Sequence, residues 1–139
     1  MRNGTTGSGF EEFEKVERWR SRADAEHHLA KAIWRVEHPD PMIGDNFNAH
    51  NTERFGGVRD ALAWVLGDTD TAPITRRYMP VRGDVQVCNE WFYGLDVIER
   101  RQTHQPPNGL TFIYCEAATR ALNWFRGLGD YEEPADYEY

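Results

Sequence analysis

The sequence feature that most constrains the fold is a helix-ending pattern that occurs twice. Residues 61–68 and 121–130 both begin with Ala-Leu-x-Trp and then reach a Gly-Asp pair, as ALAWVLGD and ALNWFRGLGD, and a proline follows each copy, at Pro73 and Pro134. Glycine supplies the left-handed residue that ends many helices, and proline prevents a helix from continuing. The pattern therefore predicts two helices that stop in the same way, each with a tryptophan on its apolar side.

The recurrence has two explanations, a duplicated unit or two helices that obey the same capping rules. Outside the shared letters, residues 52–73 and 108–134 do not match. Helices with the same cap and the same apolar stripe look alike without common descent. We therefore favour shared capping rules over duplication.

The chain has 139 residues, of which 40% are hydrophobic and 13% aromatic, so a single domain can bury a substantial core. Residues 1–9 combine glycines with Thr and Ser, which predicts a flexible leader. Residues 131–139 read as an acidic tail. The expected organisation is thus one helical domain over residues 10–130 between these two segments.

Apolar residues at three- and four-residue spacing predict a compact all-α bundle of about five helices. The expected helices cover residues 10–20, then a second that Ser21 caps and Pro39 ends, a third that starts at Asn51 or Thr52, a fourth from Asp84 to His104, and a fifth over 110–128. The first two could also form one continuous helix. Each helix has one tryptophan, and we expect all five to share one core: Trp19, Trp34, Trp64, Trp91 and Trp124.

Two segments leave an α+β alternative open. Residues 85–88 begin with the alternation Val-Gln-Val, and residues 110–114 are rich in β-branched and aromatic side chains, so both could be short strands. Gly94 also weakens the fourth helix by about 1 kcal/mol relative to alanine. Residues 75–83 have no helical period and predict an extended crossing.

Charge and cysteine content limit which cellular compartment and which classes of partner we expect. Five acids lie in the last ten residues, so the net charge of −7 falls to −2 for the rest of the chain. A nearly neutral body makes nucleic acid an improbable partner. The chain has neither a membrane-length apolar run nor a secretion signal, and Cys88 and Cys115 are too few for a disulfide framework. We expect a cytoplasmic protein with reduced thiols, with a single disulfide as the alternative.

The most basic and aromatic third of the chain is the first candidate binding surface. Arginine side chains can grip phosphate or an acidic protein surface, and aromatic rings anchor interfaces. The balance of this region is only slightly positive, which favours a protein partner or self-association over nucleic acid. This basic–aromatic set consists of Arg76, Arg77, Tyr78, Arg82, Trp91, Tyr93, Arg100, Arg101 and His104.

A second candidate is a polar loop between the second and third helices. Residues 39–51 read as a connection, and convergent amides with a histidine can carry function. The alternative is an Asx-rich turn that caps the third helix. A calcium-binding loop is excluded, because the sixth loop position lacks the required glycine and the apolar Phe47 stands where a ligand would be needed. The side chains concerned are Asp45, Asn46, Asn48 and His50.

Acidic pairs at i and i+3 supply a metal-site alternative. Glu11 with Glu14 and Asp96 with Glu99 could hold Mg²⁺ if their helices faced each other. This layout resembles the all-helical nucleotide pyrophosphohydrolases, which implies a Mg²⁺-dependent phosphohydrolase. The competing interpretation is that these acidic side chains form a solvated helix face beside nearby lysine and arginine. We favour this interpretation and expect no cofactor.

The run at 61–73, together with fourteen arginines against two lysines, resembles small accessory proteins of actinobacteria and their phages. The resemblance implies no catalytic residues, because that group is mostly of unassigned activity. We therefore expect a small, non-enzymatic helical interaction protein, phage-encoded as one alternative, that binds another macromolecule. The phosphohydrolase and a nucleic-acid-associated protein stay as alternatives.

Overall fold

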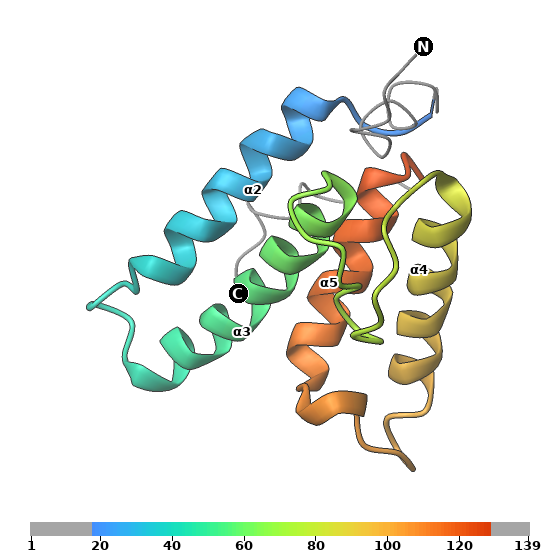
Figure 1. The fold of residues 1–139 in the computed structure, drawn as a ribbon. Helices are drawn as coiled ribbons and strands as arrows, with labels where there is room; N and C mark the ends of the chain where they lie inside the picture. Colours follow the sequence, from blue (N-terminus) through green and yellow to red (C-terminus); the bar gives the residue numbers. More distant parts are fainter. Residues whose placement is uncertain (1–17, 129–139) are drawn as a thin grey trace.

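The computed structural model describes residues 18–128, which form an all-α fold (Figure 1). Four α-helices and one short 3-10 turn occupy this range, and none of its residues belongs to a strand ladder. The predicted leader, almost all of the predicted helix 10–20 and the acidic tail lie outside the described residues. The helices are α2 (Arg22–Glu37), α3 (Asp45–Val65), α4 (Asp84–Glu99) and α5 (Phe112–Phe125), with the turn η1 (Pro107–Gly109) before α5.

Helix α5 is the centre of the arrangement. It packs against α3 on one side and α4 on the other, and α2 packs mainly against α3 as the first arm of a helical hairpin (Figure 1), with His28 of α2 also in contact with the Trp124 ring of α5. Ten of the fourteen residues of α5 are buried, including Cys115, Leu122 and Phe125. The outer helix α2, by contrast, buries only Ala25, His28, Leu29 and Ala32.

Helix α2 starts where the sequence predicts. The Ser21 side chain accepts a hydrogen bond from the Asp24 backbone N–H at 3.0 Å, and residues 18–21 are not helical, so no helix runs continuously through Ser21. The spacing of Leu29, Ile33 and Val36 predicts an apolar stripe on the buried side of this helix, and this prediction is wrong in part. Ile33 is 37% exposed because the buried face of α2 is built on the small residues Ala25 and Ala32.

Helix α3 begins earlier than predicted, at Asp45 after Gly44 in the left-handed region. The supposed polar loop therefore forms its first two turns. Asn and Asp favour turns because their side chains compete with the helix backbone. Here the Asn48 side chain instead reaches out of the helix to the backbone of Asp40, so the competition does not arise.

Helix α4 starts at Asp84, with Gly83 as its N-cap where the sequence predicts Asp84 as the cap, and it ends at Glu99 rather than near His104. The Gln86 side chain accepts from the backbone N–H of Gly83 at 2.9 Å and so fixes this start. Residues 85–88 are helical, and residues 112–114 open α5, so neither predicted strand exists. The one bridge in the described range is an isolated pair, Thr71 with Tyr78, in the connection between α3 and α4.

The recurring motif ends two helices in the same way, as predicted, but α5 spans Phe112–Phe125 rather than 110–128, and its cap glycine is Gly127. Gly67 and Gly127 have φ of 84° and 76°. After α3, Gly67 N donates to Trp64 O and Asp68 N to Ala63 O, at 3.1 and 2.9 Å. After α5, Gly127 and Leu128 repeat both bonds, at 2.9 and 3.3 Å. This paired geometry is a Schellman cap, which satisfies carbonyls that the helix leaves open.

The five tryptophans do not share one core. Trp19, Trp64 and Trp124 are 6%, 0% and 3% exposed, and the Trp64 ring N–H donates to Met79 O at 2.7 Å. Trp91 is half-buried. Trp34 is 57% exposed, so the prediction that every helix contributes an indole to the interior is wrong for α2.

Asp84 joins three parts of the chain at one end of the bundle. Its carboxylate accepts from the Trp19 ring N–H at 2.8 Å, from Arg126 Nε and Nη2 at 3.0 and 2.9 Å, and also from Arg18. The hydrogen bond from Arg126 is the main reason that the pKa of Asp84 lies below its usual value. The start of α4, the end of α5 and residues 18–20 are thereby held together.

Glycines allow the central helices to approach closely. A side chain at Gly57 would clash with the Tyr114 carbonyl of α5, and one at Gly94 would clash with the Thr119 hydroxyl. Gly94 therefore belongs in α4 despite its low helix propensity, because α5 occupies the space that a Cβ would need.

None of the helices within residues 18–128 has both the length and the hydrophobicity needed to cross a bilayer. Cys88 and Cys115 are free thiols, so the disulfide alternative is wrong.

Candidate functional site

The site begins with the turn between α2 and α3. Pro39 ends α2 because the residue before a proline disfavours helical geometry. Asn48 then fixes the turn, since its side chain accepts from Asp40 N at 3.1 Å and donates to Asp40 O at 2.8 Å. The Asp40 carboxylate in turn accepts from Met42 N at 2.9 Å. The polar residues of this region thus hold the turn in one conformation.

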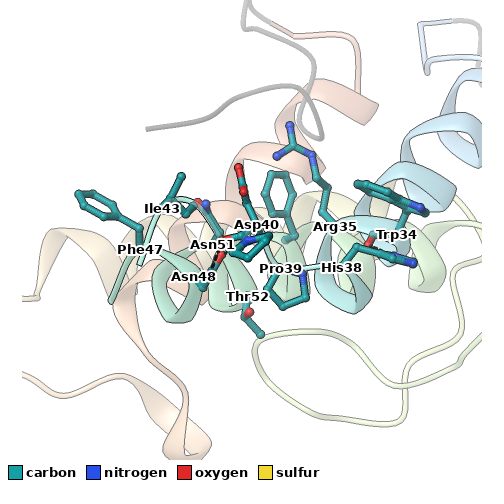
Figure 2. A pocket seen from close by; sticks show the side chains of 12 residues that line it. Trp34, Arg35, His38, Pro39, Asp40, Ile43, Phe47, Asn48, Asn51 and Thr52 are labelled. Carbon is teal, nitrogen blue, oxygen red and sulfur yellow. Dashed lines mark hydrogen bonds between the residues drawn. The ribbon is translucent and has the colours of Figure 1, made fainter. Parts of the chain in front are cut away.

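A groove of about 650 Å³ lies where the last turn of α2 faces the first turns of α3 (Figure 2). We call it the hairpin groove. In Figure 2, Trp34 and His38 lie at one end and Phe47 with Ile43 at the other. Its lining residues are Trp34, Arg35, His38, Pro39, Asp40, Pro41, Ile43, Phe47, Asn48, Asn51, Thr52 and Phe55.

Large apolar side chains stay open to solvent around this groove. Trp34 is 57% exposed, Phe47 61% and Ile43 37%, and Met42 beside them in the turn is 88% exposed. Phe55 is only 1% exposed, and the guanidinium of Arg35 lies 4.7 Å from its ring centroid. The buried Phe55 ring therefore forms the floor of the groove, and exposed apolar side chains form its walls.

The Trp34 ring is held in place although it is exposed. It stacks on His38, one turn later, with ring centroids 4.4 Å apart and an interplanar angle of 14°. His38 Nδ1 also lies 2.9 Å from the Trp34 carbonyl oxygen, so the histidine bridges the end of the helix. An exposed aromatic that is already ordered loses little side-chain entropy when a partner covers it.

The basic–aromatic set does not form one compact surface. Arg82 precedes α4 and Arg100 follows it, and a helix of 16 residues separates its ends by about 24 Å. Trp91 and Tyr93 are two residues apart on this helix, so they face different sides. Trp91 is half-buried under the guanidinium of Arg126, at 5.3 Å, while the other members are exposed: Arg76, Arg77, Tyr78, Arg82, Tyr93, Arg100, Arg101 and His104.

The polar candidates lie at one end of the hairpin groove. Asp45, Asn46 and His50 are in the first turns of α3, of which only His50 is half-buried. Asn48 is the member whose role is visible, because it fixes the turn at Asp40. Of the four polar candidates, Asn48 is the one that lines the hairpin groove.

The metal alternative depends partly on residues that the structure does not describe, because Glu11 and Glu14 precede residue 18. Asp96 and Glu99 are exposed on α4, and Asp96 accepts from Arg100 Nε at 3.1 Å. Among residues 18–128 no group of three or more metal-ligating side chains comes together. The Mg²⁺ site stays a prediction.

A thiol nucleophile at Cys115 has no support from its surroundings. The side chain is fully buried, and this burial raises its pKa to about 11. A thiol with such a pKa stays protonated at neutral pH, whereas the thiolate is the reactive form.

Sequence reasoning placed Trp34 in the core and did not identify Phe47 as part of a binding site. A helical stripe predicts which residues share a face but not which face meets the partner helix, and Trp34 was therefore assigned to the core. The apolar pair Met42-Ile43 inside an otherwise polar turn was the signal that could have identified the groove.

A comparison with models of known protein families, with curated proteins and with solved structures finds no match to this chain. The resemblance to actinobacterial and phage accessory proteins accordingly stays a prediction.

Proposed function

We propose that this protein is a small, non-enzymatic interaction protein that binds a short apolar peptide segment of another protein in the hairpin groove. One observation carries the proposal: Trp34, Ile43 and Phe47 surround a groove of about 650 Å³ and remain exposed. Exposed apolar side chains that cluster around a concavity are typical of binding sites.

The lining of the groove favours a peptide without strong charge. Arg35 and Asp40 are its charged members, so the formal charge of the lining is zero when His38 is neutral. Asn51 and Thr52 add polar groups that can pair with the backbone of a bound segment. We infer an occupant whose apolar or proline side chains contact Trp34 and Phe47 while its backbone faces α3.

The two aromatic side chains at opposite ends of the groove should provide most of the binding free energy. Truncation of an aromatic anchor in an interface commonly costs 2 kcal/mol or more, which corresponds to a loss of affinity of roughly 30-fold. Trp34→Ala and Phe47→Ala should each weaken peptide binding by about this factor.

A selection from a random 12-residue peptide library against the immobilised protein tests the proposal. Selected peptides are then measured by fluorescence anisotropy against the wild type, Trp34→Ala and Phe47→Ala. Phe92→Ala is the matched control, because Phe92 is also a phenylalanine with 61% exposure but lies on α4. We expect apolar peptides that lose affinity with both groove variants and keep it with Phe92→Ala.

Salt dependence distinguishes this proposal from nucleic-acid binding. Peptide affinity should change little between 50 and 500 mM NaCl, since the groove has no net charge to screen. Binding of nucleic acid would weaken steeply over the same range.

Two results would contradict the proposal. The first is a selection whose peptides bind Trp34→Ala and Phe47→Ala as tightly as the wild type. The second is a wild-type dimer in sedimentation equilibrium that becomes monomeric in Trp34→Ala, because a second copy would then be the occupant of the groove.

A further inference from the structure

A second pocket, of about 410 Å³, lies between the parts of α2 and α3 that are farther from the turn joining these helices. It shares no lining residue with the hairpin groove. Leu29 and Ile33 of α2 and Ala63 of α3 form an apolar wall. The opposite side comes from the connection that follows α3. Its remaining lining residues are Arg59, Asp60, Asp68, Thr69, Thr71, Pro73 and Arg76.

A hydrogen-bonded cluster lies beside the charged side of this pocket. The Tyr114 hydroxyl of α5 donates to Asp60 Oδ2 at 2.5 Å, and Arg59 Nε donates to Asp60 Oδ1 at 2.9 Å. Both oxygens of the carboxylate therefore have a donor. Burial and the bond to Asp60 raise the pKa of Tyr114, so its hydroxyl stays protonated at neutral pH. Arg59 compensates the charge of Asp60.

Arg76 adds a second guanidinium to this cluster. Its Nη2 donates to the Tyr114 hydroxyl oxygen at 3.3 Å, and its guanidinium carbon lies 5.5 Å from the Tyr114 ring centroid. Arg76 is exposed as a residue, so its remaining donors can reach a ligand from the pocket side. Asp68, also exposed, is the one other charged lining residue, and solvent screens it.

The backbone of Arg76 is in an unfavourable conformation. Its φ is 61°, in the left-handed region that glycine and asparagine tolerate and arginine avoids. Arg76 N donates to Ala72 O at 3.1 Å, and Ala72 N donates to Arg77 O at 2.9 Å, so a tight turn imposes this geometry. Backbone strain of this kind persists only where the surroundings determine it, and it concentrates at functional sites.

The surroundings hold this turn from two sides. Glu90 of α4 is fully buried, and its Oε2 accepts from the backbone N–H of Ile74 and Thr75 at 2.7 and 2.8 Å. The side-chain amide of Asn108 donates to the carbonyl oxygens of the same two residues, at 2.9 and 3.2 Å. These bonds fix the backbone of the turn next to Arg76, and the hydrogen bond to Tyr114 directs the Arg76 side chain.

From this geometry we propose that the pocket binds a small carboxylate with an apolar body, whose carboxylate pairs with Arg76 and whose body contacts Leu29, Ile33 and Ala63. Arginine recognises carboxylates because its planar fork of N–H groups matches their two oxygens. The apolar wall selects against inorganic anions. The pocket volume lies within the range of small-molecule sites.

Hexanoate is the probe, and protein-observed NMR of the full-length chain is the measurement. We expect shifts confined to the pocket residues and an affinity that rises roughly fourfold for each methylene from propionate to hexanoate. Hexan-1-ol has the same body without the charge, and inorganic phosphate has the charge without the body. Both should bind at least tenfold more weakly than hexanoate.

Arg76→Gly tests the role of the side chain without a risk to the fold, because glycine adopts the positive φ without strain. This variant should keep or raise the Tm and weaken hexanoate binding at least tenfold. Arg77→Ala is the matched control, since Arg77 is the exposed neighbour outside the pocket, and its affinity should equal that of the wild type.

The proposal is overturned if hexanoate does not bind at millimolar concentration, if hexan-1-ol or phosphate binds as well as hexanoate, or if Arg76→Gly binds it unchanged. Peptide binding in the hairpin groove is measured on the same samples. Since the two sites share no residue, the failure of one proposal leaves the other open to its own test.

Discussion

Helix α3 contacts its two neighbours in different ways, and the contrast separates the stable part of the molecule from the part available to partners. On the α5 side, Gly57 lets the helices approach until the Tyr114 carbonyl fills the place of a side chain. On the α2 side, beyond Phe55, the helices leave the hairpin groove with Trp34 and Phe47 in solvent. Aromatic side chains are buried in the core on the α5 side of α3, but they stay exposed around the groove on the α2 side.

This difference teaches that aromatic content alone does not measure the core. Trp64 is fully buried and its ring N–H is bonded, so it contributes to stability. Trp34, by contrast, is mostly exposed, with its ring stacked on His38, and it contributes to the surface. Substitutions on the two sides of α3 should therefore separate stability from binding.

The largest expected effect is on the closed side. Trp64→Ala removes a fully buried ring and should lower the free energy of unfolding by about 3–5 kcal/mol. Urea denaturation followed by circular dichroism measures this. A loss below 1 kcal/mol would show that the interior does not depend on this side chain.

The two adjacent glycines of α3 give an internal comparison. Gly57→Ala should destabilise by about 2 kcal/mol, because the new methyl group meets the backbone of α5. At Gly56 the nearest atom to a new Cβ would be Arg59 Nη2 at 3.7 Å, so Gly56→Ala should stabilise by about 0.5–1 kcal/mol through helix propensity. Thermal denaturation of both variants should show Tm changes of opposite sign, and equal changes would contradict the close contact of α3 with α5.

Asp84 should have the next effect, and it depends on pH. Asp84→Asn removes the charge opposite Arg126, whose side chain is only 7% exposed, and should cost about 2 kcal/mol at pH 7. Because the folded-state pKa of Asp84 is lowered, this contribution is complete above the unfolded-state value of about 3.9 and is lost as the pH falls below it.

Urea midpoints of Asp84→Asn and wild type should therefore converge at low pH. The control is Asp96→Asn, which removes an exposed ion pair with Arg100 and should change stability by about 0.5 kcal/mol or less. A difference between wild type and Asp84→Asn that persisted undiminished at pH 2 would exclude a charge effect.

The smallest expected effect on stability belongs to the open side. Trp34→Ala should change the free energy of unfolding by about 0.5 kcal/mol or less, since the ring is mostly in solvent. Combined with a roughly 30-fold loss of peptide affinity, this result would separate binding from folding. A loss of several kcal/mol would place Trp34 in the core after all.

Local features of the fold could be read from the sequence. The Ser21 cap and the glycine cap at Gly67 each depend on residues within one helical turn, and both occur as the sequence indicates. The start of α3 could not be read in this way. It depends on whether the Asn48 side chain hydrogen-bonds to the backbone of its own helix or to Asp40, and the sequence is compatible with both.

The candidate sites were harder to predict because their residues meet across long stretches of sequence. Arg76 was identified as a binding residue, but its neighbours Asp60 and Tyr114 come from α3 and α5 and have no sequence signal that links them. The exposure of Trp34 depends on the rotation of α2 about its axis, which follows from Ala25 and Ala32 packing inward. Periodicity gives the stripe but not this rotation.

The buried carboxylate of Glu90 has a consequence for motion. Since it holds the amides of Ile74 and Thr75 from within α4, the connection between α3 and α4 cannot open unless that helix also moves. Deuterium should therefore enter these two amides only as slowly as it enters the centre of the molecule. The connection between α3 and α4 has no regular secondary structure, yet it should be among the segments best protected from exchange. Proteases should therefore cut the chain elsewhere first.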